Sequence, residues 1–450
     1  MNSFPEPLAS KDIDFNQEFA LAYDILENSG RNVFITGKAG TGKSTLLQYF
    51  RNHTSKNVAV LAPTGVAAVN IKGQTVHSFF RFRPDITPDG VRNIRLRRAQ
   101  KALYENLDAV IVDEISMVRA DLLDCMDVFL RLHGPKKMIP FGGVQMVFIG
   151  DLFQLPPVVA GGEGSLFGDV YASPYFFDSM IYREIHRGAG HPSRFETIEL
   201  KKIYRQKEED FIKLLGVIRD RTADAQHLKV LNQRYKPDFQ PDQKDLYIYL
   251  TTTNSMADRI NRARLEQLPG ESYLYDGVMD GNFESRNLPT HQALELKADA
   301  QVMLLNNDPN GRWSNGSIGK IWRFIDSGKI IMVELQGGST VEVVPFKWEM
   351  FRFFYNEDTQ SLESEAVGSF TQYPLKLAWA LTIHKSQGKT FTKVVIDVGS
   401  GTFAHGQIYV ALSRCTSFEG IILKRPILPR HILLDGNVTD FMASQLSAAG

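Results

Sequence analysis

The 450-residue sequence contains only two cysteines, Cys125 and Cys415, too few for the disulfide framework of a small secreted scaffold. It has no apolar run that approaches the roughly 18 residues of a membrane span. Residues 1–14 lack the basic region and the apolar stretch of a secretion signal. The sequence therefore predicts a soluble protein of the cytoplasm.

An excess of either charge is also missing, because 51 Lys and Arg residues balance 51 Asp and Glu residues. A formal charge of zero argues against a protein coated in positive potential, but it is compatible with a local basic groove. Cys and His residues do not recur at zinc-ligand spacing, so we expect no zinc. A chain of this length predicts about three domains.

Short apolar runs alternate with helical patterns between about residues 31 and 150. Each run is rich in Val, Ile and Phe and ends at Gly, Pro or an acidic residue, which is typical of strands buried in a parallel sheet. The predicted strands are Val33–Thr36, Val58–Ala62, Ala109–Val112 and Met146–Gly150, and a helix is expected over Ser44–Arg51. Ligands bind at the carboxyl ends of such strands, so the residues that follow them are the informative ones.

The first strand leads into GKAGTGKST, residues 37–45, which fits the phosphate-binding loop pattern. Its glycines let backbone N–H groups surround phosphate oxygens, and the next helix adds partial positive charge. Lys43 would reach the β- and γ-phosphates, and the Ser44 hydroxyl would bind Mg²⁺. The alternative, a glycine-rich turn, is disfavoured by the strand before it and the helix after it. The expected nucleotide-binding residues here are Gly40, Thr41, Gly42, Lys43, Ser44 and Thr45.

Acidic and amide side chains follow the third and fourth predicted strands. Asp113 would hold Mg²⁺, and Glu114 would orient and deprotonate an attacking water. Gln154 would contact a γ-phosphate or that water. Taken alone, these residues could equally be solvated side chains at strand ends. Beside a phosphate loop, the pair of acids favours hydrolysis.

Together these residues resemble superfamily 1 helicases, and in particular the Pif (petite integration frequency) family of 5′-to-3′ DNA helicases, which is related to RecD. The resemblance extends over roughly residues 15–417. It rests on an ordered series of motifs: GKAGTGKST (37–45), APTGVAA (62–68), TVHSFF (75–80), VDEISM (112–117), GDLFQLPPV (150–158), LKKIYRQ (200–206), TTTNSMADRIN (251–261), LTIHKSQGKTF (381–391) and GQIYVALSRCTS (406–417). Each motif is weak alone, and their order is specific.

The resemblance implies roles for residues that spacing alone leaves uninterpreted. Asn16 and Gln17 resemble the family's adenine-reading element, and Tyr204 resembles the residue that stacks on the base. Gly388 and Lys389 are expected to face the same nucleotide. The implied cofactors are ATP and Mg²⁺.

Two arginines of the second half look like arginine fingers. Arg205 and Arg414 match the family's positions, and planar guanidinium groups suit a charge spread over γ-phosphoryl oxygens. For an unassigned arginine, a surface ion pair would be the better interpretation. As fingers, they imply that ATP draws the two halves of the chain together.

The implied fold class is α/β: two RecA-like parallel-sheet cores with a small inserted β-barrel and a small insertion in the first core. The expected limits are 1–190 for the first core, 191–300 and 373–450 for the second core, and 301–372 for the barrel. Gly and Pro at 187–192 predict a linker. Strand-like runs at Leu246–Leu250, Val394–Asp397 and Ile421–Leu423 fit the second core, and the hairpin signals of Ile318–Phe324, Ile330–Leu335 and Ser339–Val344 fit the barrel. The barrel could also be a purely structural insertion.

Single-stranded DNA is the implied partner, and the family's strand contacts fall on Thr64, His77, Thr382 and His384. The insertion, at about residues 79–105, carries a basic stretch from Arg81 to Lys101. A solvated face is the simpler interpretation of such a stretch. At the place where the family inserts an element near the duplex junction, phosphate contact is favoured. DNA binding should then weaken steeply with salt.

The sequence thus predicts an ATP-driven 5′-to-3′ helicase that works on single-strand/duplex junctions, acts as a monomer and also opens G-quadruplexes. We expect it in the cytoplasm of a bacterium, associated with the nucleoid. Two alternatives are a nucleotide-gated single-strand clamp and a RecD-like subunit of a larger complex. The tail after about Asn437 is expected to fray.

Overall fold

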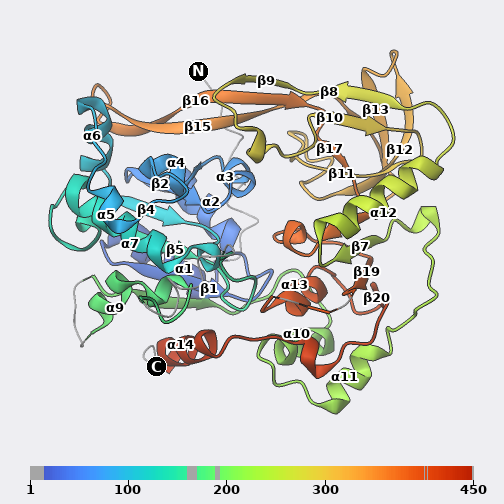
Figure 1. The fold of residues 1–450 in the computed structure, drawn as a ribbon, viewed down its shortest axis with the longest axis horizontal. Coiled ribbons are helices and arrows are strands. Elements are labelled where there is room, and N and C mark those ends of the chain that lie inside the picture. Colours follow the sequence, from blue (N-terminus) through green and yellow to red (C-terminus); the bar gives the residue numbers. More distant parts are fainter. Residues whose placement is uncertain (1–14, 160–169, 188–192, 400, 403, 448–450) are drawn as a thin grey trace.

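The computed structural model describes residues 15–159, 170–187, 193–399, 401–402 and 404–447. The chain forms a first core, a second core and a group of antiparallel strands that lies beside both (Figure 1). None of the helices in these ranges is long and apolar enough to cross a membrane. Residues 188–192 of the predicted linker lie outside the described residues.

The first core is built on a six-stranded parallel sheet. Its order is β3 (Gln74–Thr75), β2 (Val58–Ala62), β4 (Ala109–Val112), β5 (Gln145–Ile149), β1 (Val33–Gly37) and β6 (Glu196–Leu200). The four predicted strands are confirmed within one residue at each end. The edge strands β3 and β6 were missed, because a two-residue strand and the mixed sequence ETIEL carry little apolar signal.

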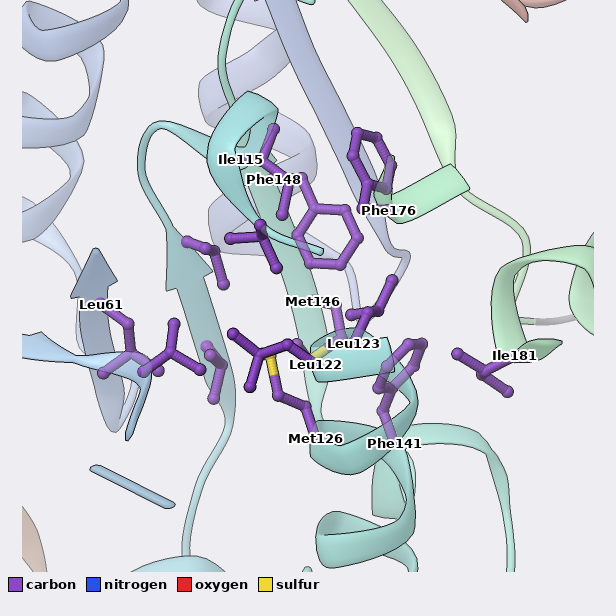
Figure 2. Close-up of a cluster of buried hydrophobic side chains, with 14 of the residues drawn as sticks. Leu61, Ile115, Leu122, Leu123, Met126, Phe141, Met146, Phe148, Phe176 and Ile181 are labelled. Atoms are coloured by element: carbon purple, nitrogen blue, oxygen red, sulfur yellow. The ribbon is translucent and has the colours of Figure 1, made fainter. Parts of the chain in front are cut away.

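Alternate residues of this sheet face two separate hydrophobic clusters. Val33, Ile35 and Ile111 pack with α1 (Gln17–Asn28) and α2 (Lys43–His53). On the other face, Phe34 and Phe148 pack with α4 (Val76–Phe80), α7 (Ala120–His133) and α9 (Met180–His186). Figure 2 shows the second cluster, in which side chains of β5 and α7 point toward one another. Burial on both faces explains why these strands are almost wholly apolar.

The second core has a four-stranded parallel sheet. Its order is β18 (Ala380–Thr382), β7 (Ile248–Thr251), β19 (Val394–Asp397) and β20 (Ile421–Leu423), and its helices include α10 (Glu209–Arg219), α11 (Ala225–Asn232), α12 (Asn254–Gln267) and α13 (Gln407–Ser413). Two parallel-sheet cores in one chain confirm the predicted α/β fold class. The short β18 was missed by sequence pattern.

The remaining strands form antiparallel sheets. One sheet has the order β14 (Thr340–Val343), β13 (Ile330–Leu335), β12 (Ile318–Ile325), β11 (Gln301–Leu304) and β17 (Leu375–Leu377). A second pairs β15 (Phe346–Asn356), β16 (Ser361–Gln372) and β9 (Val278–Gly281), and a third pairs β10 (Ala293–Leu296) with β8 (Tyr273–Asp276). Residues 301–372 therefore contribute to two sheets rather than to one.

The β15–β16 hairpin runs along the top of the molecule in Figure 1 and reaches the first core. There the Gln74 side chain accepts a hydrogen bond from the Phe353 N–H, and the Asn57 side chain accepts one from the Leu362 N–H. The Phe353 ring joins the hydrophobic cluster of the first core. The hairpin thus ties the antiparallel strands to the first core.

The domain limits stay a prediction, and two contacts bear on where the first core stops. β6 lies beyond the predicted linker yet pairs with β1 over its full length. The final helix, α14 (Gly436–Ser447), buries Val438 and Met442 in the first core, and the Phe441 ring stacks on the Phe177 ring. The expectation of a frayed tail was wrong for residues 437–447, because this helix has an apolar side that fills a gap in the cluster.

The insertion of the first core contains α5 (Pro88–Val91) and α6 (Arg98–Glu105). Its arginines are exposed, at positions 81, 83, 92, 95, 97 and 98. Val91 and Leu103 anchor the insertion in the hydrophobic cluster below. It therefore presents its basic side chains to solvent on a fixed support.

Candidate functional site

The phosphate loop joins β1 to α2, as the sequence predicts. Gly40 and Gly42 adopt φ angles of +82° and +91°, which favour glycine. A Cβ on Gly40 would lie 2.5 Å from the Cβ of Arg205, so the glycine also permits close approach of the segment that follows β6. The Gly40 carbonyl accepts a hydrogen bond from the Tyr204 N–H at 2.9 Å.

Lys43 begins α2 and turns its side chain back over the loop. Its ammonium donates to the carbonyls of Gly37, at 2.7 Å, and Lys38, at 3.1 Å. Burial lowers the pKa of Lys43, and the carboxylates of Asp151 and Glu114 oppose that shift. The ammonium therefore lies inside the loop, where it is available to an incoming phosphate.

The two acids after β4 lie side by side. An Asp113 carboxylate oxygen accepts the Glu114 N–H at 3.0 Å, and Glu114 adopts a positive φ of 53°. Burial raises the pKa of both carboxyls, and the negative charge of Asp113 further raises the pKa of Glu114. The strained backbone of Glu114 directs its side chain into the cavity described below.

A buried polar network lies behind Gln154. The Gln154 side chain donates to Asp151 at 3.1 Å, and Asp151 forms an ion pair with Arg219 of α10 at 3.2 Å. The Tyr409 hydroxyl of α13 accepts the Ala39 N–H at 3.0 Å and donates to Asp151 at 3.4 Å. The side chains of Asp151 and Arg219 are 0% and 5% exposed. This network joins the phosphate loop to two helices of the second core.

The two predicted arginine fingers meet at the same place. Arg414 is 1% exposed, and its guanidinium donates to the Val410 carbonyl and the Ser413 hydroxyl. Arg205 donates to the Ser413 carbonyl at 3.2 Å. Burial, and then the neighbouring Arg205, lower the pKa of Arg414 to about 9. Arg414 is buried and Arg205 is half-buried, and two such adjacent cations make the site attractive to an anion.

These groups enclose one cavity of about 540 Å³ between the cores. Its size is within the range of small-molecule sites. The lining residues are Phe19, Ala39, Gly40, Thr41, Gly42, Lys43, Ser44, Thr45, Glu114, Gln154, Tyr204, Arg205, Gly388, Thr390 and Arg414. The structure therefore brings together most of the residues that the sequence assigns to the nucleotide.

The oxygen donors here fit Mg²⁺. The Ser44 hydroxyl and the Glu114 carboxylate line the cavity, and Asp113 lies next to Glu114. Hydroxyl and carboxylate oxygens are the ligands that this hard cation prefers. Burial disfavours the charged form of both neighbouring acids, and a divalent cation bound beside them would favour it again.

At the outer end of the cavity, Tyr204 is 45% exposed and lies near the start of α1. The Asn16 side chain accepts the Phe19 N–H at 2.8 Å, and so caps α1, and donates to the Tyr204 hydroxyl at 3.4 Å. Gln17 is exposed and is not among the lining residues, because the first turn of α1 turns Phe19 inward instead.

The end of the LTIHKSQGKTF motif also differs in part from expectation. Gly388 and Thr390 line the cavity, whereas the Lys389 ammonium donates to the Asn315 side chain at 2.8 Å. Lys389 directly follows Gly388, whose φ of +75° turns the chain, and its side chain therefore faces Asn315 rather than the cavity. Only its carbonyl approaches Arg414, at 3.4 Å.

The four predicted strand contacts lie after strands at one edge of each parallel sheet. Thr64 follows β2 and caps α3 (Gly65–Asn70), and His77 lies in α4 after β3. Thr382 ends β18, where its hydroxyl accepts the Lys385 N–H, and His384 follows it. Both pairs are therefore at the carboxyl ends of their strands, as expected for ligand contacts.

Sequence reasoning missed several members of the site. Gln387 donates to Glu114 at 3.2 Å and to Gln154 at 3.4 Å, and so bridges the cores. Arg219 and Tyr409 belong to helices whose patterns indicate only packing. Gln387 lies in the motif LTIHKSQGKTF and Tyr409 in the motif GQIYVALSRCTS. Their place in these motifs is a signal from which their role in the site could have been predicted. Arg219 had none.

Comparisons of sequence agree with this geometry. Residues 15–227 match the sequence profile of the family described as PIF1-like helicase. The ATP-dependent DNA helicase Pif1 of Bdellovibrio bacteriovorus is 30% identical over 96% of this chain and 92% of its own. The ATP-dependent DNA helicase PIF1 of Emericella nidulans is 29% identical over 93% of this chain, but the match covers only 62% of that longer relative.

Comparisons of structure give the same result. Pif1 from Bacteroides sp, solved in complex with ADP-AlF4, is 35% identical and has a TM-score of 0.87, with 97% of this chain and 98% of that chain covered. The Bacteroides Pif1 structure bound to ssDNA is 36% identical, with the same coverage and a TM-score of 0.69. On the sequence identity, the coverage and the shared architecture, this chain belongs to the PIF1-like helicase family.

Proposed function

We propose that this chain is an ATP-dependent DNA helicase that moves 5′ to 3′ on single-stranded DNA and opens the duplex ahead. One observation carries the proposal. The phosphate loop and Glu114 of the first core face Arg205 and Arg414 across a single cavity. Pif1 from Bacteroides has been solved with ADP-AlF4 and with ssDNA, which supports both ligands for this chain.

The phosphate loop and Lys43 would hold the triphosphate of ATP, and Asn16 and Tyr204 would flank the base. Glu114 would accept a proton from the attacking water, positioned with Gln154. Arg205 and Arg414 would stabilise the charge that develops on the γ-phosphoryl oxygens, worth about 10³–10⁵ in rate. Ser44 and Asp113 would hold Mg²⁺, which would neutralise charge on the phosphates.

Hydrolysis would be coupled to movement because the cavity draws on both cores. Gln387 contacts Glu114 and Gln154, and it is three residues from His384 in a motif expected to contact DNA. A change at the γ-phosphate would therefore alter the distance between Thr64 and His77 on one core and Thr382 and His384 on the other. When the distance between two sites that hold the DNA strand alternates, the protein moves along the strand in one direction.

The direction, the activity on G-quadruplexes and action as a monomer are proposed from family membership. The exposed arginines of the insertion would contact phosphates at the junction. A clamp without turnover is disfavoured by the set of hydrolytic residues around the cavity. A RecD-like subunit would share the cavity and differ in needing a partner to unwind DNA.

The test is unwinding of one duplex that carries either a 5′ or a 3′ single-stranded tail, with ATP and Mg²⁺. We expect only the 5′-tailed substrate to open, and Lys43→Ala, the matched control, to open neither. Opening of the 3′-tailed substrate alone would reject the direction. DNA-stimulated ATP hydrolysis without unwinding would favour the subunit, and absence of hydrolysis would favour the clamp.

A further inference from the structure

Three lysines converge at the seam between the second core and the antiparallel strands. Lys376 is on the edge strand β17, Lys385 is in the turn after β18, and Lys389 follows in the same motif. We call Lys376, Lys385 and Lys389 the lysine cluster. Burial, and then the positive charges of Lys389 and Lys385, lower the pKa of Lys376 to about 7.

The lysine cluster lacks a counter-ion within the described ranges. The side chains of Lys376 and Lys385 make no hydrogen bond or ion pair there, and Lys389 is bonded only to the Asn315 amide. Burial lowers the pKa of Lys389 to about 8. Lys376 and Lys389 are half-buried, and Lys385 is exposed. Two half-buried ammonium groups close together without an acid are unfavourable unless an anion joins them.

The surroundings of the lysine cluster indicate which anion this is. His384 and Thr382 are the two residues of the second core that are expected to touch the strand. Lys385 is next to His384 in sequence, and its N–H donates to the Thr382 hydroxyl. On the opposite side, Asn315 donates to Asn70 at 3.1 Å. Asn70 ends α3, the helix that Thr64 caps. The lysine cluster therefore lies between the strand contacts expected on the two cores.

We propose that the lysine cluster binds a backbone phosphate of the single strand, with Lys376 as its central ligand. This inference rests on the proposed function, since it deepens the site of that same strand. It also reassigns Lys389, whose ammonium points to Asn315, from the nucleotide to the strand. On binding, a phosphate oxygen would replace the Asn315 amide oxygen as the acceptor of Lys389.

The experiment measures binding of a fluorescein-labelled oligothymidine by anisotropy, without nucleotide, at several salt concentrations. Lys376→Met removes the charge and keeps the length of the side chain. We expect its affinity to fall about tenfold and the slope of log affinity against log salt to flatten by about 0.7, the value for one lost contact. Lys376→Arg should retain the wild-type slope.

Lys213→Met is the matched control, because Lys213 is exposed and already paired with Glu209 and Asp210. It changes net charge equally and should leave binding within twofold of wild type. The thermal midpoint of Lys376→Met should equal or exceed that of wild type, because an unpaired ammonium is removed. A lower midpoint would make the lysine structural and overturn the inference.

A second arm separates the two sources of phosphate. Binding of a fluorescent ATP analogue without DNA should be the same for Lys376→Met and wild type. If nucleotide binding weakens instead, the anion is the nucleotide and the inference fails. If wild type binds the strand and Lys376→Met binds it equally well, only the lysine assignment fails. If wild type does not bind the strand, the proposed function fails with it.

Discussion

The two cores share parallel-sheet architecture but differ in what they bring to the cavity between them. The first has six strands and supplies the phosphate loop and Glu114. The second has four strands and no phosphate loop in its described residues, and it supplies Arg414 and Gln387. Binding groups and charge-stabilising groups are thus divided between cores. Because hydrolysis needs groups from both cores, its rate depends on whether the two cores are close together.

The largest effect should come from the second core. Arg414→Ala should lower the kcat of ATP hydrolysis by about 10³–10⁵, since the guanidinium would act on charge that develops in the transition state. Binding of a fluorescent ATP analogue should change far less, and steady-state hydrolysis with single-stranded DNA is the measurement. Arg414→Lys keeps the charge without the fork and should remain impaired. Equal losses of binding and kcat would place Arg414 with the binding groups.

In the first core, substitution of Glu114 should also lower the rate of ATP hydrolysis. Glu114→Gln keeps the shape of the side chain but cannot accept a proton, so kcat should fall by about 10²–10⁴ while the nucleotide still binds. Lys43→Ala should lose binding as well, which separates the two roles within one core. Glu105→Gln, at a partly exposed acid of α6, is the matched control. Wild-type turnover by Glu114→Gln would remove it from the mechanism.

The link between the cores should show in stability. Arg219→Met leaves Asp151 as a buried charge without its ion-pair partner, so the free energy of unfolding should fall by about 3–5 kcal/mol. The double variant Arg219→Met/Asp151→Asn should recover part of that loss, because no buried charge remains. Chemical denaturation followed by circular dichroism measures both. Additive losses in the double variant would mean that the two residues act independently.

The smallest effect concerns pH and is confined to the first core. Asp127 on α7 accepts the Phe141 N–H and pairs with Arg131, each at 2.7 Å. Burial raises the pKa of Asp127 to about 6. Its protonated form therefore adds stability below pH 3.8, and that contribution is lost as the pH rises through 6.

The stability of Asp127→Asn relative to wild type should accordingly rise by about 3 kcal/mol between those two pH values, from the size of the shift. Denaturation curves of both proteins at each pH measure it. A difference that does not vary with pH would show that Asp127 keeps an ordinary pKa.

Much of the site was predictable because phosphate chemistry demands fixed residue types next to strands. Gly40, Lys43 and Glu114 were found that way, and they line the cavity. Arg205 and Arg414 also line the cavity, and they were predicted only through the family resemblance. Arg219 has the sequence context of an amphipathic helix, and only packing against Phe153 and Asp151 reveals it. Lys389 was misplaced toward the nucleotide, since sequence does not tell which way a side chain in a turn points.

The short strands and edge strands of the sheets could not be predicted from the sequence either. β3 and β18 are too short for a periodic pattern, and β6 alternates polar and apolar residues at a sheet edge. The sequence also did not show that the β15–β16 hairpin contacts the first core. Its hydrogen bonds to Gln74 and Asn57 join residues that are 279 and 305 positions apart. Contacts at that distance leave no local trace.

The packing of α14 against the first sheet has a consequence for the order of events during synthesis. Domains generally fold as units while the chain emerges, amino-terminal end first. Here the hydrophobic cluster of the first core needs Val438 and Met442, which are made after the entire second core. The phosphate loop is therefore translated early, whereas the hydrophobic cluster of its core is complete only after α14 has been translated. A ribosome that stops after β20 would release a first core without α14, the helix beside that core in Figure 1, and part of the hydrophobic cluster would be exposed.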